Sequence, residues 1–172
     1  MTSLTIDPTA PNTIHAGTAF AGEVFKSTDA GETWRRTLEA TRGGGVVFFI
    51  RFAPTNGTLF AGISGTLYRS PDSGTSWKEV ATPDSVGSGS AIAFGQNGKR
   101  YLATQKGVYL SRAGSGWVDM STGLPKQHRW VNALAVGPRG ERLYAGVEPS
   151  YAGDEEHGLY VRDLTTTEET SQ

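Results

Sequence analysis

The residues best suited to bind a ligand lie in and just before one insertion, at 147–157. This stretch carries an aromatic ring, four acids and a histidine, and the segment 126–130 adds an arginine and a tryptophan. Aromatic rings with a few well-placed polar groups are typical of ligand sites. The candidate ligand-binding rim consists of Arg129, Trp130, Tyr151, Asp154, Glu155 and His157. The alternative is a solvated acidic loop, with Trp130 packed as an ordinary core residue beside Val131.

Several kinds of chemistry are disfavoured by composition. The chain has no cysteine, which excludes a thiolate zinc site and a cysteine nucleophile. A metal at Asp154, Glu156 and His157 is disfavoured, because neighbouring residues in a loop rarely preset metal geometry. A phosphate loop and a serine elbow are missing, and a net charge of −1 supplies no field for nucleic acid. We therefore predict no catalytic residue, no metal, no cofactor and no nucleic-acid partner.

The elements that position these residues come from a repeat of four similar units in 172 residues. Apolar triplets end at Ile6, Phe52, Phe94 and Val136, which lie 46, 42 and 42 residues apart. Alanines of the next apolar segment, at 16, 61, 103 and 145, lie 45, 42 and 42 apart. Turn sequences such as 56–57 and 97–98, both Asn-Gly, separate the two segments. We place four short strands in each unit, and no helix longer than one turn.

Four-stranded units with a period of roughly 40–45 residues are typical of propeller blades. The sequence therefore predicts an all-β protein, a β-propeller of about four four-stranded antiparallel blades. The blades are expected at approximately 1–42, 43–86, 87–128 and 129–164, followed by a polar C-terminal tail or weak last strand at 165–172.

Two segments within these units share a motif. STDAGETW (27–34) and SPDSGTSW (70–77) both fit Ser-x-Asp-x-Gly-x-Thr/Ser-Trp, and 111–117 is a shortened copy. The motif resembles the Asp-box, or BNR, repeat of sialidase-like, sortilin-like, xyloglucanase-like and photosystem II assembly factor-like propellers. The fourth unit has lost the motif.

The motif residues are expected to stabilise the turn. Serine and aspartate side chains bind backbone groups of such a turn, glycine supplies the unusual φ, and tryptophan buries a large surface. The structural Asp-box residues are Ser27, Asp29, Gly31, Trp34, Ser70, Asp72, Gly74, Trp77 and Trp117. The resemblance also implies that the box lies away from a catalytic centre. Asp29 and Asp72 as catalytic carboxylates or Ca²⁺ ligands are the disfavoured alternative.

The resemblance implies glycosidase chemistry in some relatives, and this sequence departs from their patterns. Sialidases of the family use three arginines, a tyrosine nucleophile and an Arg-Ile-Pro motif, whereas 50–54 reads Ile-Arg-Phe-Ala-Pro. Xyloglucanase-like members place two acids in a far larger pair of propellers. We therefore expect a non-catalytic module that acts as a binding or assembly scaffold for a protein or a glycan. The alternative is a fragment or subunit of a larger glycoside hydrolase.

Four blades stand at the lower end of the usual range of 4–8. The last unit has no clear fourth strand, and the first unit begins at its first strand. We expect self-association through open blade edges, with two four-blade halves forming one ring as an alternative to a closed four-bladed or partial propeller.

No apolar run is long enough to span a membrane, and residues 1–20 do not resemble a signal peptide. The compartment is left open: cytoplasmic for a complete chain, extracellular or periplasmic for a fragment of a typical family member.

Overall fold

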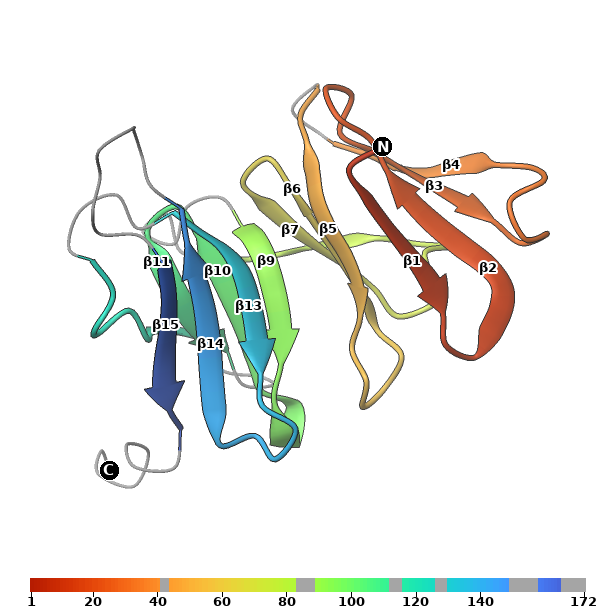
Figure 1. The fold of residues 1–172 in the computed structure, drawn as a ribbon. Coiled ribbons are helices and arrows are strands. Elements are labelled where there is room, and N and C mark those ends of the chain that lie inside the picture. The colour runs from red at the N-terminus through yellow and green to blue at the C-terminus, as the bar shows by residue number, and fades with distance from the viewer. Residues whose placement is uncertain (41–43, 83–88, 112–115, 126–129, 149–157, 165–172) are drawn as a thin grey trace. The chain divides into compact units, whose positions relative to one another are not determined.

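The computed structural model describes residues 1–40, 44–82, 89–111, 116–125, 130–148 and 158–164 (Figure 1). Their regular structure is almost entirely antiparallel β-sheet. The chain divides into two compact units, Met1–Thr82 and Pro83–Gln172. Within the described ranges, no helix has the length and hydropathy needed to cross a membrane.

The first unit contains two four-stranded sheets, each with its strands in chain order. The first sheet consists of β1 (Ser3–Asp7), β2 (Ala10–Gly17), β3 (Glu23–Ser27) and β4 (Arg35–Glu39). The second sheet consists of β5 (Val47–Phe52), β6 (Leu59–Ile63), β7 (Thr66–Ser70) and β8 (Lys78–Val80).

The second unit has the same organisation. The third sheet consists of β9 (Gly89–Phe94), β10 (Arg100–Thr104), β11 (Gly107–Ser111) and β12 (Trp117–Asp119). The fourth sheet consists of β13 (Val131–Val136), β14 (Arg142–Val147) and β15 (Gly158–Asp163). It therefore has three strands among the described residues, and the weak last strand considered at 165–172 lies outside them, while the other three sheets have the predicted four.

The repeat spacing misplaced one residue. Ala61 lies opposite Ile50, but the residue opposite Ile92 is Leu102 rather than Ala103. The cause is the β9–β10 hairpin, which connects its strands through 95–99, one residue fewer than the 53–58 loop of the second sheet. Because side chains alternate between faces, this one-residue difference moves Ala103 to the opposite face from Ala61.

Each unit has a core formed between its two sheets. In the first unit, Val24 of β3 packs with residues of β5, β6 and β7, including Val47, Ile50 and Leu59. A Cβ on Gly17 would lie only 2.5 Å from Val47 Cγ1, so the sheets approach there too closely for any side chain. In the second unit, Tyr101 and Val108 pack with residues of the fourth sheet.

The predicted blade limits at 42, 86 and 128 fall outside the described residues, as does the tail at 165–172. These limits stay a prediction.

Candidate functional site

The predicted ligand-binding rim is described at Trp130 alone. Arg129, Tyr151, Asp154, Glu155 and His157 lie outside the described residues. Trp130 directly precedes β13, and its carbonyl accepts a hydrogen bond of 3.1 Å from the Glu148 amide, just after β14. Trp130 is 39% exposed, so its ring is not part of the core that the alternative required. It stands at the end of the β13–β14 ladder from which the 149–157 connection departs.

A second rim lies on the first sheet, in the connection between β2 and β3, and sequence reasoning missed it. Phe20 is 88% exposed and has a φ of +70°, which is uncommon for a residue with a side chain. Its carbonyl accepts a hydrogen bond of 2.8 Å from the Gly45 amide, and the Thr18 carbonyl accepts one of 3.0 Å from Val47. The Phe20 rim, defined as residues 18–22 with 44–47, is thus tied to the strand that opens the second sheet.

Glycines make this close approach possible. A Cβ on Gly44 would lie 2.9 Å from the Phe20 carbonyl oxygen, and one on Gly45 would lie 2.4 Å from Ser64 Oγ. Both glycines also have positive φ, at +77° and +130°. The signals in the sequence were a lone phenylalanine in a short loop and a run of glycines before β5. Neither signal predicts that residues 18–22 and 44–47 lie in contact.

The turns at 27–34 and 70–77 use their polar side chains internally. Ser27 Oγ accepts a hydrogen bond of 2.9 Å from the Gly31 amide, and Asp29 Oδ1 accepts one of 2.9 Å from Thr33. Hydrogen bonds from the Ser27 and Thr33 side chains hold the pKa of Asp29 down to about 2. The carboxylate is therefore ionised and occupied by its own turn at neutral pH.

The second turn repeats the arrangement. Ser70 Oγ accepts a hydrogen bond of 2.7 Å from the Gly74 amide, and Asp72 Oδ1 accepts one of 2.8 Å from Ser76. Hydrogen bonds from the side chain and backbone of Ser76 hold the pKa of Asp72 well below its usual value. Within the described ranges, no three His, Asp or Glu side chains gather as a metal site.

The tryptophans that follow these turns differ in environment. Trp34 lies at the surface, and its indole Nε1 donates a hydrogen bond of 3.0 Å to the Gly31 carbonyl. Trp77 packs against the core of the first unit, and its buried Nε1 has no partner among the described residues. Trp117 is the first residue of β12 and pairs with Ser111; residues 112–115 of the shortened copy lie outside the description.

A buried polar cluster joins the first sheet to the second turn. The Ser73 hydroxyl donates a hydrogen bond to Asp7 Oδ2, and Lys26 Nζ donates one of 2.6 Å to the Ser73 carbonyl. His15 Nε2 lies 3.5 Å from Ser73 Oγ. Burial, with a smaller contribution from the Lys26 charge, lowers the pKa of His15 to about 4, so the ring is neutral at pH 7.

Serine, histidine and aspartate together suggest nucleophilic catalysis, but the geometry is different. A catalytic histidine accepts the serine proton and is oriented by the aspartate. Here the hydroxyl of Ser73 donates to the Asp7 carboxylate, and His15, Asp7 and Lys26 are all buried. The cluster is a packing contact between two sheets. His15 and Ser73 are 58 residues apart, so nothing in the sequence pattern indicates that they meet.

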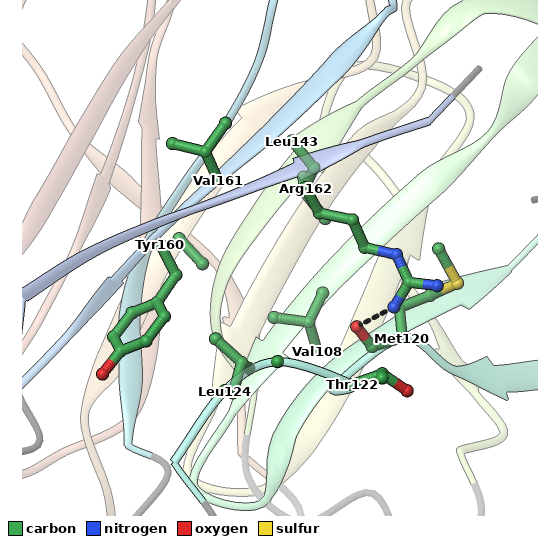
Figure 2. A pocket seen from close by; sticks show the side chains of 10 residues that line it. Val108, Met120, Thr122, Leu124, Leu143, Tyr160, Val161 and Arg162 are labelled. Carbon is green, nitrogen blue, oxygen red and sulfur yellow. Dashed lines mark hydrogen bonds between the residues drawn. The ribbon is translucent and has the colours of Figure 1, made fainter. Parts of the chain in front are cut away.

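The second unit contains a small cavity between its sheets (Figure 2). It is lined by Val108, Met120, Leu124 and Tyr160, and Arg162 Nη1 donates a hydrogen bond of 2.8 Å to the Met120 carbonyl. Its volume is about 60 Å³, whereas small-molecule sites usually measure roughly 300–1,000 Å³. The cavity has room for a few water molecules and is too small for a sugar unit.

Comparison with known proteins places the architecture. No family model matches the chain. A probable oligoxyloglucan-reducing end-specific xyloglucanase from Neosartorya fischeri is 34% identical over 83 residues, which are 45% of this chain and 10% of that protein.

Solved structures match over most of the chain. An ancestral GH74 enzyme superposes with a TM-score of 0.71 at 19% identity, over 97% of this chain and 25% of that one. The GH74 xyloglucanase from Xanthomonas campestris superposes with a TM-score of 0.74 at 22% identity, over 93% of this chain and 28% of that one. YCF48 bound to D1 peptide superposes with a TM-score of 0.57 at 19% identity, over 86% of this chain and 47% of that one.

These likenesses establish the fold. The all-β, β-propeller prediction is confirmed, because the matched structures are β-propellers and each of the four sheets corresponds to one blade. The chain spans about a quarter of the length of the GH74 structures and a tenth of the curated relative that it matches.

Proposed function

We propose that this chain is a non-catalytic β-propeller module of the Asp-box type that binds a protein segment at its rim. The observation that carries the proposal is Phe20, a large apolar side chain that is 88% exposed on a loop held by backbone hydrogen bonds. An aromatic side chain on a rigid backbone binds with a small loss of conformational entropy, which is why such residues dominate protein interfaces.

The described carboxylates support a non-catalytic role. Asp29 and Asp72 each accept hydrogen bonds from their own turns on both carboxylate oxygens, and Asp7 is buried between two sheets. Glycoside hydrolysis needs two carboxyl groups facing one substrate bond, at about 5–10 Å from one another. The turn carboxylates are instead committed to maintaining local structure.

An extended peptide is the ligand that best suits the Phe20 rim. The ring offers apolar contact, and a neighbour of the same fold has been solved with a peptide bound. The rim on the fourth sheet, proposed as Arg129, Trp130, Tyr151, Asp154, Glu155 and His157, extends the same role to a second blade. Binding of a glycan at these aromatic residues would mean that the rim recognises carbohydrate and not a protein segment.

Selection of random peptides displayed on phage tests the proposal. Peptides enriched on the wild-type chain should lose at least about tenfold in affinity on Phe20→Asn, the loss expected of a hot-spot side chain. Asparagine tolerates positive φ well, so this variant keeps the loop conformation. Val118→Asn, which changes another exposed apolar residue on β12, should bind normally. Enriched peptides that bind Phe20→Asn as well as wild type would contradict the proposal.

The second candidate is a part of a larger glycoside hydrolase. It is favoured by the 34% identity to a xyloglucanase and by the small share of each GH74 chain that is matched. Incubation with xyloglucan, a fluorogenic glucan and a fluorogenic sialoside separates the two. Release of product by the purified chain would establish catalysis and overturn the non-catalytic proposal.

Self-association belongs to the same proposal. Among the described residues, β15 pairs with β14 alone, so the outer edge of the fourth sheet is open. An open edge favours pairing with another strand.

A further inference from the structure

The fourth sheet has one covered flank and one free flank. Leu143, Ala145 and Val147 of β14 point to the core of the second unit. The alternate residues form the free flank, in two cross-strand rows: Ala133, Gly146 and Leu159, and Ala135, Tyr144 and Val161. Leu159 is 71% exposed and Val161 is 54% exposed. An apolar sheet face of this kind indicates a site of protein contact.

The third sheet carries the same two rows of residues. They are Ala91, Ala103 and Val108, and Ala93, Tyr101 and Leu110. At three equivalent positions the third and fourth sheets have the same residue type, alanine twice and tyrosine once. At the other three positions both residues are small or aliphatic: Gly146/Ala103, Leu159/Val108 and Val161/Leu110. In the third sheet this surface is covered, and Tyr101, Ala103 and Val108 are buried against the fourth sheet. The free flank is thus a sheet-packing surface against which no sheet of the second unit lies among the described residues.

The partner surface can be read from the existing contact. The fourth sheet covers the third with a row formed by Leu134, Ala145 and Tyr160. In the first sheet, Leu4, Ala16 and Phe25 form the corresponding row, with Ile6 and Ile14 beside them. Leu4 is 54% exposed and Ile6 is 52% exposed, so the outer strand of this face is exposed, whereas Ala16 in the middle of the row is buried. The chain therefore carries both halves of one type of contact, and each half has exposed apolar side chains on its own sheet.

We propose that the free flank of the fourth sheet packs against the exposed flank of the first sheet in a second copy of this chain. This inference rests on the self-association part of the proposed function, and it adds flank packing to edge pairing as the contact between copies. Such a contact is head-to-tail, and the proposal is that two equivalent contacts close a ring of two copies rather than continue as an open filament. The partner is a second copy because the chain itself supplies the complementary row of leucine, alanine and aromatic side chains.

Sedimentation velocity over micromolar to high micromolar concentrations tests the proposal. The wild-type chain should form a species of twice its mass of 18.3 kDa. Leu159→Glu/Val161→Glu and Leu4→Glu/Ile6→Glu should each raise the dissociation constant by about 100-fold or more, because each buries unpaired carboxylates in the contact. Phe20→Glu is the control, since it places one such carboxylate at an exposed apolar residue outside both flanks and should leave the dimer intact. Circular dichroism should give the wild-type spectrum for all variants.

Mixing the two flank variants tests the head-to-tail geometry. Each variant retains the flank that the other has lost, so an equimolar mixture should regain a two-chain species at high micromolar concentration. A single-chain wild type at all concentrations would overturn the proposal, as would a mixture that stays monomeric. A dimeric Leu4→Glu/Ile6→Glu variant would overturn it too, because the fourth-sheet flank would then pair with itself.

Failure of this inference can be told apart from failure of the peptide-binding proposal. Peptide binding is measured on the monomeric flank variants, where Phe20 is unchanged, and dimerisation is measured on Phe20→Glu. Loss of one property leaves the other standing.

Discussion

Replacing Gly74 by alanine tests how the second Asp-box turn is joined to the first sheet. Gly74 has a φ of +75°, and a Cβ there would lie 2.6 Å from His15 Cε1 and 3.0 Å from His15 Nδ1. Gly57 is the matched control: its φ is +65°, and a Cβ there would meet nothing within 4 Å. Both substitutions impose backbone strain, but Gly74→Ala alone also adds a steric overlap.

The expected losses follow from these two contributions. An L-residue in the left-handed region costs roughly 1–2 kcal/mol, so Gly57→Ala should lower the free energy of unfolding by about 1 kcal/mol. Overpacking of a core adds typically 1–3 kcal/mol. His15 is fully buried and cannot swing into solvent to relieve the overlap. We therefore expect Gly74→Ala to lose about 3 kcal/mol, about 2 kcal/mol more than the control.

Urea unfolding followed by tryptophan fluorescence measures the difference. With slopes of about 1–3 kcal/mol per molar urea, 2 kcal/mol separates the two midpoints by about 1 M. On a His15→Ala background the overlap is gone, so the loss caused by Gly74→Ala should fall to that of the control. Equal midpoints for Gly74→Ala and Gly57→Ala would refute the reasoning, since the approach of the turn to His15 would then have no energetic effect.

Three further predictions concern the turns and the buried cluster. Trp77→Ala should lower the free energy of unfolding by about 2–3 kcal/mol and Trp34→Ala by about 1 kcal/mol, because Trp77 packs on the core and Trp34 is at the surface; equal urea midpoints would contradict this. The pKa of His15 is lowered to about 4 from 6.5, so the folded state disfavours the charged ring. The free energy of unfolding should therefore be about 3 kcal/mol higher above pH 6.5 than at pH 4 and below, because protonation of His15 favours the unfolded chain as the pH falls. His15→Gln should remove this pH dependence. Asp29 and Asp72 are occupied by their own turns, so millimolar Ca²⁺ should leave the melting temperature unchanged; a rise would restore the metal-ligand reading.

Much of the fold could be predicted because its signals are local. Asn97 and Gly98 both adopt positive φ, as their hairpin position predicts. The third sheet shows where this reasoning fails. The spacing of alanines placed Ala103 at the position that Leu102 occupies, because a hairpin shortened by one residue changes the face of every following side chain.

The candidate site was less predictable than the fold. Phe20 was missed because its importance comes from exposure and from hydrogen bonds to a segment 25 residues later in the chain. The cluster around Ser73 was missed for the same reason, since its partners Asp7 and His15 belong to another sheet. Trp130 was predicted as a rim residue from its type and position; the structure adds that the residue is 39% exposed, and the rim itself stays a prediction.

Strand order, turn chemistry and the four-fold repeat depend on residues a few positions apart, so the amino-acid sequence alone specifies them. Part of the glycine-rich composition follows from the same local demands at turns, whereas Gly17 is needed because a strand of another sheet approaches it. Which flank of a sheet is covered and which carboxylate or histidine is buried depend on distant segments meeting. Similar rows of small, tyrosine and aliphatic residues are core in the third sheet and mostly exposed in the fourth. Packing, and not residue type, sets this difference, because the same side chains lose their contact with water only when another sheet lies against them.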